Sequence, residues 1–220
     1  MTKEVNNKKK CISLVLSLSL LFSVSCVPTF AAESSSITST HTIALDQIAD
    51  SSNVYISDAM TFTEMVNYFA NKNNISYEKA LTHFPNTAQS RSVSATYRTL
   101  SVGLTVTSEY HPSIDFYCET SETSNYWGIV SIYSVHLNRG YNGISRQFSG
   151  TLEFWLRSAY QIEYIINGDF YYNGTTTVSG GEGVNVGIDK LCTVNYQASN
   201  SYEANHYKYF YEGRTVAFQS

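Results

Sequence analysis

Charged residues and prolines are scarce in this 220-residue chain. Lys, Arg, Asp and Glu together make up 15% of the sequence, whereas about a quarter of an average soluble domain is charged. Only 3 prolines and 2 tryptophans accompany 18 tyrosines, so the surface must be built largely from Ser, Thr, Asn and Tyr. The basic residues form no cluster beyond the first ten positions. We therefore expect no positive patch for nucleic acid or anionic lipid head groups, and no nucleic-acid partner.

Short motifs that signal an enzyme are also missing. The chain has no G-x-S-x-G, H-E-x-x-H, P-loop or EF-hand loop, and its 5 histidines are scattered. Carboxylate pairs such as Glu119 with Glu122, or Glu153 with Glu163, could serve a glycosidase only at a separation of about 5 to 9.5 Å, which a sequence cannot give. We interpret them as solvated charges. The sequence thus predicts a non-enzymatic protein with no cofactor and no metal.

The N-terminal residues have the three-part organisation of a secretory signal peptide. Four lysines in the first ten residues precede an uncharged run over residues 11–27, and a small-residue cleavage site ends at Ala31. We predict a signal peptide over residues 1–31, a product that begins at Ala32, and a location outside the cell or in the cell wall. Cleavage would remove four lysines and one glutamate and change the formal net charge from −4 to −7.

Two alternatives to a cleaved, freely secreted product stay open. A retained membrane anchor is the less favoured one, because residues 11–27 are too few and too rich in serine to span a bilayer comfortably. Lipidation of Cys26 is the other. The sequence before Cys26 is a degenerate lipoprotein signal that lacks the usual leucine three residues earlier.

Cleavage would leave two cysteines, Cys118 and Cys192, both at inward-facing positions of expected strands. In an oxidising compartment these two residues could form one disulfide. Alternatively, each is a separately buried thiol that packs as a small hydrophobic side chain. A bond requires Cα atoms about 5.5 Å apart, so the sequence leaves both alternatives open.

A leader and two helices precede the strands. Residues 32–57 are rich in Ser and Thr without periodicity, which predicts a flexible leader, and residues 58–86 predict a short helical hairpin. Thr61 and Glu64 have the spacing of a capping box, and Ser76 can cap a second helix. Both helices would have an apolar stripe, formed by Phe62, Met65, Val66, Phe69 and Ala70 in the first and by Tyr77, Ala80, Leu81 and Phe84 in the second.

From about residue 92 the hydrophobic period changes from 3.6 to 2, which is typical of half-buried strands. The alternation recurs in eight or nine short segments, and turn signals at residues 167–169 and 212–213 divide the later ones. We therefore predict a mainly β fold, in which an antiparallel β-sandwich or barrel over residues 92–220 is preceded by the helical hairpin. Because alternation supplies a complete set of inward faces, we expect residues 92–220 to fold without the helices.

Two segments carry a resemblance to other proteins: residues 65–80, MVNYFANKNNISYEKA, and residues 126–131, YWGIVS. On these residues the chain resembles a group of secreted proteins of Gram-positive bacteria that join an N-terminal helical hairpin to a C-terminal all-β domain. The resemblance covers about residues 60–220. The group has no known activity or catalytic motif, so the resemblance implies an order of elements and no function.

The excess of aromatic residues at outward-facing strand positions is the remaining functional feature. Tyr rings flanked by Asn, Gln, Asp and Thr suit the apolar faces and hydroxyls of sugars, although Tyr is also a favoured strand residue for packing reasons alone. We predict a secreted, non-enzymatic binding module for cell-wall carbohydrate or a surface protein. Its candidate ligand-binding residues are Tyr117, Trp155, Tyr207, Tyr209 and Tyr211, with one of Tyr171 and Tyr172.

A membrane-active toxin or bacteriocin-like protein is the alternative function. Residues 171–188 form a Gly-centred, Ser/Thr-rich segment whose alternation of apolar and hydroxyl residues would suit insertion into a membrane as a hairpin. Its weakness is length. A spanning strand needs about nine to eleven alternating residues, and residues 175–178 offer no clean run.

Overall fold

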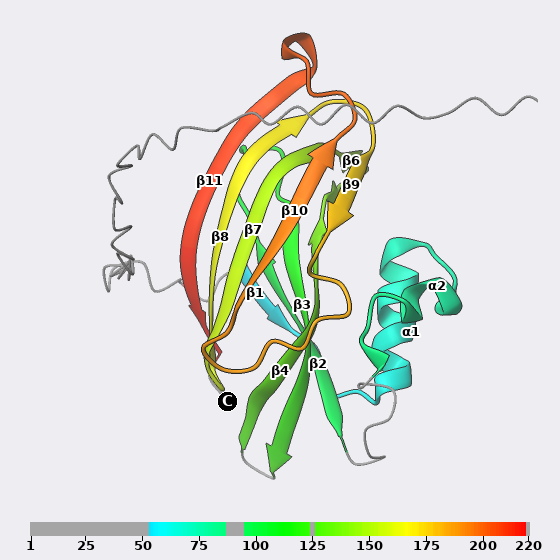
Figure 1. The fold of residues 1–220 in the computed structure, drawn as a ribbon, viewed down its shortest axis with the longest axis vertical. Coiled ribbons are helices and arrows are strands. Elements are labelled where there is room, and N and C mark those ends of the chain that lie inside the picture. The colour runs from blue at the N-terminus through cyan, green and yellow to red at the C-terminus, as the bar shows by residue number, and fades with distance from the viewer. Residues whose placement is uncertain (1–52, 87–94, 124–125, 219–220) are drawn as a thin grey trace, which may run out of the picture. The chain divides into compact units, whose positions relative to one another are not determined.

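The computed structural model describes residues 53–86, 95–123 and 126–218. The predictions for the signal peptide, for Ala32, for Cys26 and for residues 32–52 of the leader lie outside these described residues. Within them the chain is mainly β, with antiparallel sheets and two short helices. The two larger sheets are separate and stack in a sandwich-like arrangement, which favours the sandwich over the barrel (Figure 1).

The four-stranded sheet has the order β1-β2-β3-β4. Its strands are β1 (Val54–Ile56), β2 (Thr96–Gly103), β3 (Ser113–Thr123) and β4 (Tyr126–Asn138). All its pairings are antiparallel, and Phe116 on β3 lies opposite both Leu100 on β2 and Val135 on β4.

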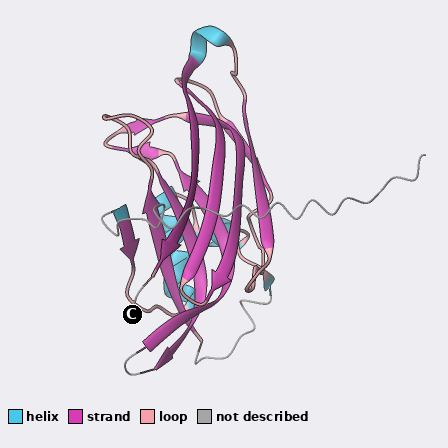
Figure 2. Ribbon diagram, turned by 90° about the vertical axis from the view of Figure 1, so that its left-hand side faces the viewer, coloured by secondary structure: helices cyan, strands magenta, loops and turns pink. Residues whose placement is uncertain are grey.

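The five-stranded sheet has the order β11-β8-β7-β10-β9 and is also antiparallel. Its strands are β7 (Gln147–Ser158), β8 (Gln161–Tyr171), β9 (Thr176–Ser179), β10 (Leu191–Ala198) and β11 (His206–Ala217). A two-stranded hairpin of β5 (Gly140–Tyr141) and β6 (Ile144–Ser145) precedes β7. The 3-10 helix η3 (Glu203–Asn205) leads into β11, and Figure 2 shows it as the cyan turn at one end of the long strands.

The main core lies between the two sheets. Alternate residues of the strands point into it, as the period of 2 predicts. Ile114, Phe116 and Cys118 come from β3, and Phe148, Leu152, Phe154 and Leu156 come from β7; all are fully buried. Burying one such aromatic or aliphatic side chain stabilises a fold by about 1.5–3 kcal/mol. The predicted inward positions of these strands are confirmed.

The two helices cover the outer face of the four-stranded sheet, on the side away from the five-stranded sheet (Figure 1). Helix α1 (Phe62–Asn73) begins with the predicted capping box, in which Thr61 N–H donates to Glu64 Oε2 over 2.8 Å and Glu64 N–H donates to Thr61 Oγ1. Helix α2 (Tyr77–Leu81) is capped by Ser76, also as predicted. A second core joins the helices to the sheet; its buried members are Met65, Val66, Phe69, Ala70, Ala80, Phe84, Tyr97, Tyr117 and Tyr133.

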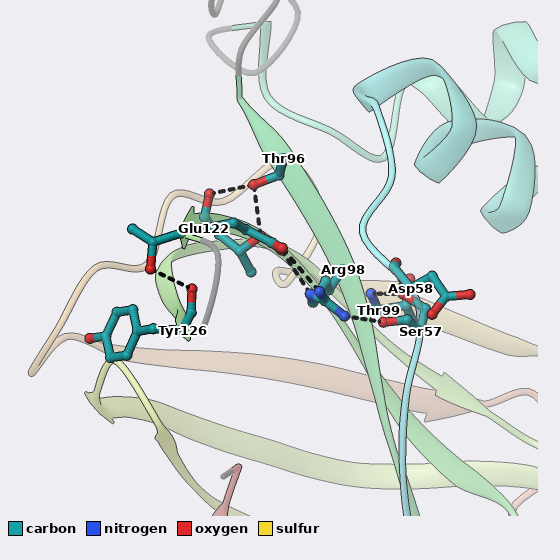
Figure 3. A network of polar contacts seen from close by, with 9 residues as sticks. Ser57, Asp58, Thr96, Arg98, Thr99, Glu122 and Tyr126 are labelled. Carbon is teal, nitrogen blue, oxygen red and sulfur yellow. Dashed lines mark hydrogen bonds and ion pairs between the residues drawn. The ribbon is translucent and has the colours of Figure 1, made fainter. Parts of the chain in front are cut away.

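Strand β1 joins the sheet through a polar network that Figure 3 shows from close by. Arg98 on β2 donates to both carboxylate oxygens of Glu122, at 2.8 and 3.0 Å, and to the carbonyl oxygen of Ser57 at 2.8 Å. Thr99 N–H donates to Ser57 Oγ. The end of β1 is thereby fixed to β2 by one charge-assisted hydrogen bond, from Arg98 to Ser57, and by a neutral one from Thr99; charge-assisted bonds are the stronger kind.

This packing corrects one prediction and bears on a second. Residues 54–57 were expected to belong to a flexible leader, but they form β1 and its link to β2, so the helices lie in the chain between two strands of one sheet. The helices also bury Tyr97, Tyr117 and Tyr133 on the outer face of the sheet. Independent folding of residues 92–220 stays a prediction, in which these three rings would lose their cover. The apolar stripe of the helices and the aromatic residues on the outer face of the sheet shield each other from water.

The two expected turns within the later strands are absent from the described chain. Residues 167–169 continue β8, and residues 212–213 continue β11. Gly168 lies directly opposite Gly150 on β7, where a Cβ on Gly150 would lie 2.6 Å from the Cα of Gly168. The glycines of this pair permit a close approach of two strands, and they do not mark a turn.

Candidate ligand-binding face

The outer face of the five-stranded sheet carries most of the predicted binding residues. The registers place one continuous row across all five strands: Ser179 on β9, Asn195 on β10, Thr151 on β7, Asn167 on β8 and Tyr211 on β11. We call this row and its outward neighbours the binding face. With strands about 4.8 Å apart, the row is roughly 19 Å wide.

A shallow hollow of about 430 Å³ lies in the binding face over β7, β9 and β10. The hollow is lined by one glycine and by residues with hydroxyl or amide side chains, and none of them is charged. The lining residues are Ser149, Gly150, Thr151, Thr177, Ser179, Asn195, Tyr196 and Gln197. Neutral donors and acceptors of this kind can exchange hydrogen bonds with ligand hydroxyls without removing a charge from water.

Tyr211 forms a flat aromatic surface at the end of the row on β11. Its side chain is 57% exposed. A Cβ on Gly213 would lie 3.6 Å from Tyr211 Oη and 3.7 Å from Ile165 Cγ1, so the ring extends along β11 over the space that Gly213 leaves free. Because more than half of the side chain is exposed, the ring is available to stack on a ligand.

Tyr209 and His206 are held in place by polar partners on β8. Tyr209 Oη donates to Asn167 Oδ1 over 2.9 Å, and His206 Nε2 lies 2.8 Å from Asp169 Oδ1. Tyr209 remains 54% exposed. Its ring is thus fixed by a hydrogen bond before any ligand binds, which reduces the entropy lost on binding.

Trp155 lies on the same face of β7 but toward its other end. It stands opposite Leu191 on β10 and Glu163 on β8, and the Arg157 guanidinium carbon lies 4.9 Å from its ring centroid. Arg157 also binds Glu163 over 2.6 Å. Trp155 is half-buried and four residues from Thr151, about 13 Å along the strand, so it lies apart from the row with Arg157 over its ring.

Tyr117 is a wrong prediction. Its side chain is fully buried on the outer face of the four-stranded sheet, where Phe69 of α1 contacts it with ring centroids 5.1 Å apart. Burial raises the pKa of Tyr117 far above its usual value. The residue does face away from the sandwich core, as its parity indicates, but the helices cover that face.

Tyr207 is also misplaced by the period of 2. The pairing of β11 with β8 shifts between His206 and Lys208, and this bulge turns Tyr207 away from the face that Tyr209 and Tyr211 share. Its ring packs against Tyr110, with centroids 6.0 Å apart, at the edge of the main core. Of the candidate tyrosines, Tyr209 and Tyr211 remain exposed on the binding face.

The two cysteines are free thiols. Cys118 is fully buried in the main core on β3, and Cys192 is half-buried on β10 in the opposite sheet. Burial raises the pKa of both thiols. Of the two alternatives that the sequence left open, the structure has the separately buried thiols.

Sequence reasoning missed a polar row beneath the helices. Asp115 on β3 is fully buried, lies opposite Ser101 on β2 and His136 on β4, and is paired with Lys72 of α1. The sequence does contain a signal for this row. Asp115 lies between the core residues Ile114 and Phe116, so it faces the outer side of the sheet, and the apolar stripe of the first helix needs such a sheet face to pack against. The carboxylate lies between the hydroxyl and the imidazole, which is not the order of a Ser-His-Asp triad.

The carboxylates considered for glycosidase chemistry have partners within the fold, and their interpretation as solvated charges is wrong for Glu119 and Glu163, which are buried. Glu119 accepts a hydrogen bond from Tyr133 Oη, Glu122 pairs with Arg98, and Glu163 pairs with Arg157. Among the residues that the structure describes, no group of three or more His, Cys, Asp or Glu side chains could hold a metal ion. In the same part of the chain, no helix has the length and apolar character needed to cross a membrane.

The segment behind the toxin alternative does not form a long hairpin. Its one regular strand is β9, which has 4 residues and pairs with β10. Residues after β9 run along the sandwich instead: Val186 bridges to Ile132 on β4, and Ile188 bridges to Leu156 on β7.

Comparisons of the chain with protein-family models, with curated proteins and with solved structures gave no match.

Proposed function

We propose that the protein is a secreted, non-enzymatic module that binds cell-wall carbohydrate across the binding face. The observation that carries the proposal is the row in which the outward ring of Tyr211 continues through Asn167, Thr151 and Asn195 to Ser179. One end of the row is an aromatic surface, and the other end lies in the polar hollow.

This combination suits the chemistry of a sugar chain. A pyranose ring has an apolar face of C–H groups, which stacks on an aromatic ring, and an edge of hydroxyls, which needs neutral donors and acceptors. Tyr211 offers the first, and the side chains of Thr151, Asn195 and Ser179 offer the second. A protein or peptide ligand would be expected to meet a deeper apolar anchor pocket.

The dimensions favour an extended ligand. A row roughly 19 Å wide is longer than one sugar unit, so several units of a chain can contact it at once. Each contact is weak because the hollow is shallow, and several contacts along one chain add to a useful affinity. The polysaccharide strands of a cell wall are a ligand of this form.

Binding of the full chain to purified Gram-positive cell walls, measured by co-sedimentation, tests the proposal. Tyr211→Ala removes the aromatic surface and should lower the affinity about tenfold, which corresponds to about 1.4 kcal/mol. Asn195→Ala removes an amide from the hollow and should lower it by a smaller factor. Tyr55→Ala is the matched control, because Tyr55 is 59% exposed on β1 of the other sheet.

The outcomes separate the possibilities. Loss of binding in Tyr211→Ala with unchanged thermal stability, together with normal binding in Tyr55→Ala, supports the proposal. Equal binding by all variants would place the ligand elsewhere, and no binding of the unaltered chain to cell walls would contradict a wall carbohydrate as ligand. A chelator should leave binding unchanged.

A further inference from the structure

Arg146, which lies between β6 and β7, has an unusual environment. Its guanidinium carbon lies 4.7 Å from the ring centroids of both Tyr172 and Tyr207. These two centroids are 5.1 Å apart and the rings are nearly perpendicular, at 78°. The guanidinium therefore lies in a corner with an aromatic ring on each of two sides, where cation–π attraction holds it.

The charge of Arg146 has no anionic partner in the described part of the chain. Arg98 and Arg157 each bind a carboxylate, whereas the guanidinium of Arg146 forms no ion pair or hydrogen bond with a described residue. Its Nε–H is buried without an acceptor. A planar fork of five N–H donors is suited to a carboxylate or a phosphate, and none of the described residues supplies one to Arg146.

Arg139 adds a second positive charge next to Arg146. Its Nη1 donates to three neutral acceptors: the carbonyl oxygen of Arg146 at 3.1 Å, Gln147 Oε1 at 2.6 Å and Thr176 Oγ1 at 3.0 Å. Burial lowers the pKa of the Arg139 guanidinium, and the groups that oppose this shift are tyrosines rather than carboxylates. Within residues 53–86, 95–123 and 126–218, these two arginines thus have no carboxylate partner, in a chain whose net charge is −4.

The aromatic corner is fixed in position and partly open. Tyr207 Oη is 2.9 Å from Thr107 Oγ1, and its ring packs edge to face on Tyr110. Tyr172 is 44% exposed, so part of its ring is available beside the guanidinium. A ligand that places a carboxylate on Arg146 can therefore also pack an apolar surface on Tyr172.

We infer that Arg146, Tyr172 and Tyr207 form a second binding site, distinct from the binding face, for a carboxylated sugar. A carboxylate matches the planar fork in two parallel hydrogen bonds, and its single charge balances that of Arg146. The sugar ring packs on Tyr172. The sugar half of this inference rests on the proposed function, whereas the carboxylate half rests on Arg146 and its missing acceptor.

Titration of the full chain with D-glucuronic acid and with D-glucose tests the inference, because these probes share a ring and differ in the carboxylate. We expect glucuronic acid to bind at least tenfold more tightly than glucose, with an affinity that falls as salt is added. The NMR signal of the Arg146 Nε–H should shift on addition of glucuronic acid and stay unchanged with glucose. Equal affinity for the two probes, or an unmoved Nε–H signal, would overturn the inference.

Variants give a second readout. Arg146→Gln should lower the affinity for glucuronic acid at least tenfold, and Arg146→Lys should lower it in part, because lysine keeps the charge and loses the fork. Lys190→Gln is the control, since it removes one exposed positive charge elsewhere. If Arg146→Gln fails to fold, the Nε–H signal of the unaltered chain decides.

The two proposals fail separately. Normal wall binding by Tyr211→Ala would contradict the binding face and leave the glucuronic acid result standing. Loss of discrimination between the two probes would remove the Arg146 site and leave the binding face untouched.

Discussion

Lys72 on α1 places its Nζ 2.7 Å from Oδ2 of Asp115 on β3, whose side chain is fully buried. The other oxygen of this carboxylate accepts a hydrogen bond from Ser113 Oγ over 3.1 Å. The helix layer is therefore attached to the sheet by an ion pair as well as by the apolar contacts of Phe69. Because one partner is entirely desolvated, this pair is expected to matter more than a surface ion pair.

Replacing Lys72 by Met should lower the free energy of unfolding by about 3 kcal/mol, because a buried carboxylate would lose its counter-charge. Urea denaturation measures the change. Lys79→Met, at an exposed position of α2, is the matched control and should stay within about 0.5 kcal/mol of the unaltered chain. Equal stability of the two variants would show that the ion pair does not hold the helices on the sheet.

The stability of the fold should fall as the pH is lowered, through His136. Burial lowers the pKa of this histidine to about 4 in the folded chain, with Arg139 and His83 adding to the shift and Asp115 and Glu182 opposing it. The unfolded chain, with a pKa near 6.5, takes up the proton first. The contribution is therefore complete above about pH 6.5 and is lost toward pH 4, by up to about 3 kcal/mol.

Urea midpoints at pH 7 and pH 4.5 measure this effect. His136→Gln, which cannot titrate, should lose part of the pH dependence, whereas His111→Gln should keep it. A pH dependence that is the same in His136→Gln and in the unaltered chain would assign acid sensitivity to other groups.

Local chemistry explains which parts of the fold the sequence predicts correctly. The capping box of Thr61 and Glu64 needs only residues three positions apart, and the inward direction of Phe116 needs only the period of 2. Tyr117 shows the limit of that period, which gives the face of a residue but not what covers the face. Tyr207 shows another limit, because one bulge reverses the parity of the residues that precede it.

The candidate site is harder to predict from the sequence, because it depends on contacts between strands that are distant in the chain. Thr151, Ser179 and Asn195 form one hollow, although they are far apart in the chain and belong to three different strands. Only the strand order and register bring them together. The period of 2 did predict that Tyr209 and Tyr211 are exposed, because the outward direction of a strand residue depends only on local alternation.

The two central cysteines should differ in reactivity. Cys118 is fully buried with a raised pKa, so alkylation of the folded chain should leave it unmodified, while half-buried Cys192 reacts slowly. Peptide mass mapping reads each cysteine separately. Reductant should not change the thermal midpoint, and a reductant-sensitive midpoint would show that the thiols are bonded in solution.

Gly150 is expected to tolerate no side chain. An added Cβ would lie 2.2 Å from the carbonyl oxygen of Asn167 and 2.6 Å from the Cα of Gly168, so β7 and β8 would have to separate. Gly150→Ala should lower the free energy of unfolding by more than about 2 kcal/mol. Gly187→Ala is the control, because no atom lies within 4 Å of its Cβ position, and a stable Gly150→Ala variant would contradict the close approach of the strands.

Gly213 should control the orientation of the Tyr211 ring. Substitutions at Gly213 can therefore change binding without changing stability. A Cβ at this position would make ordinary contacts, 3.6 Å from Tyr211 Oη and 3.7 Å from Ile165 Cγ1, so Gly213→Ala should be tolerated. Gly213→Val adds two methyl groups where the ring lies and should displace it, although valine favours a strand. We expect Gly213→Val to keep its thermal midpoint and to lose about as much wall binding as Tyr211→Ala. Normal binding by Gly213→Val, measured by the same co-sedimentation, would show that the flat orientation of Tyr211 is not what the ligand uses.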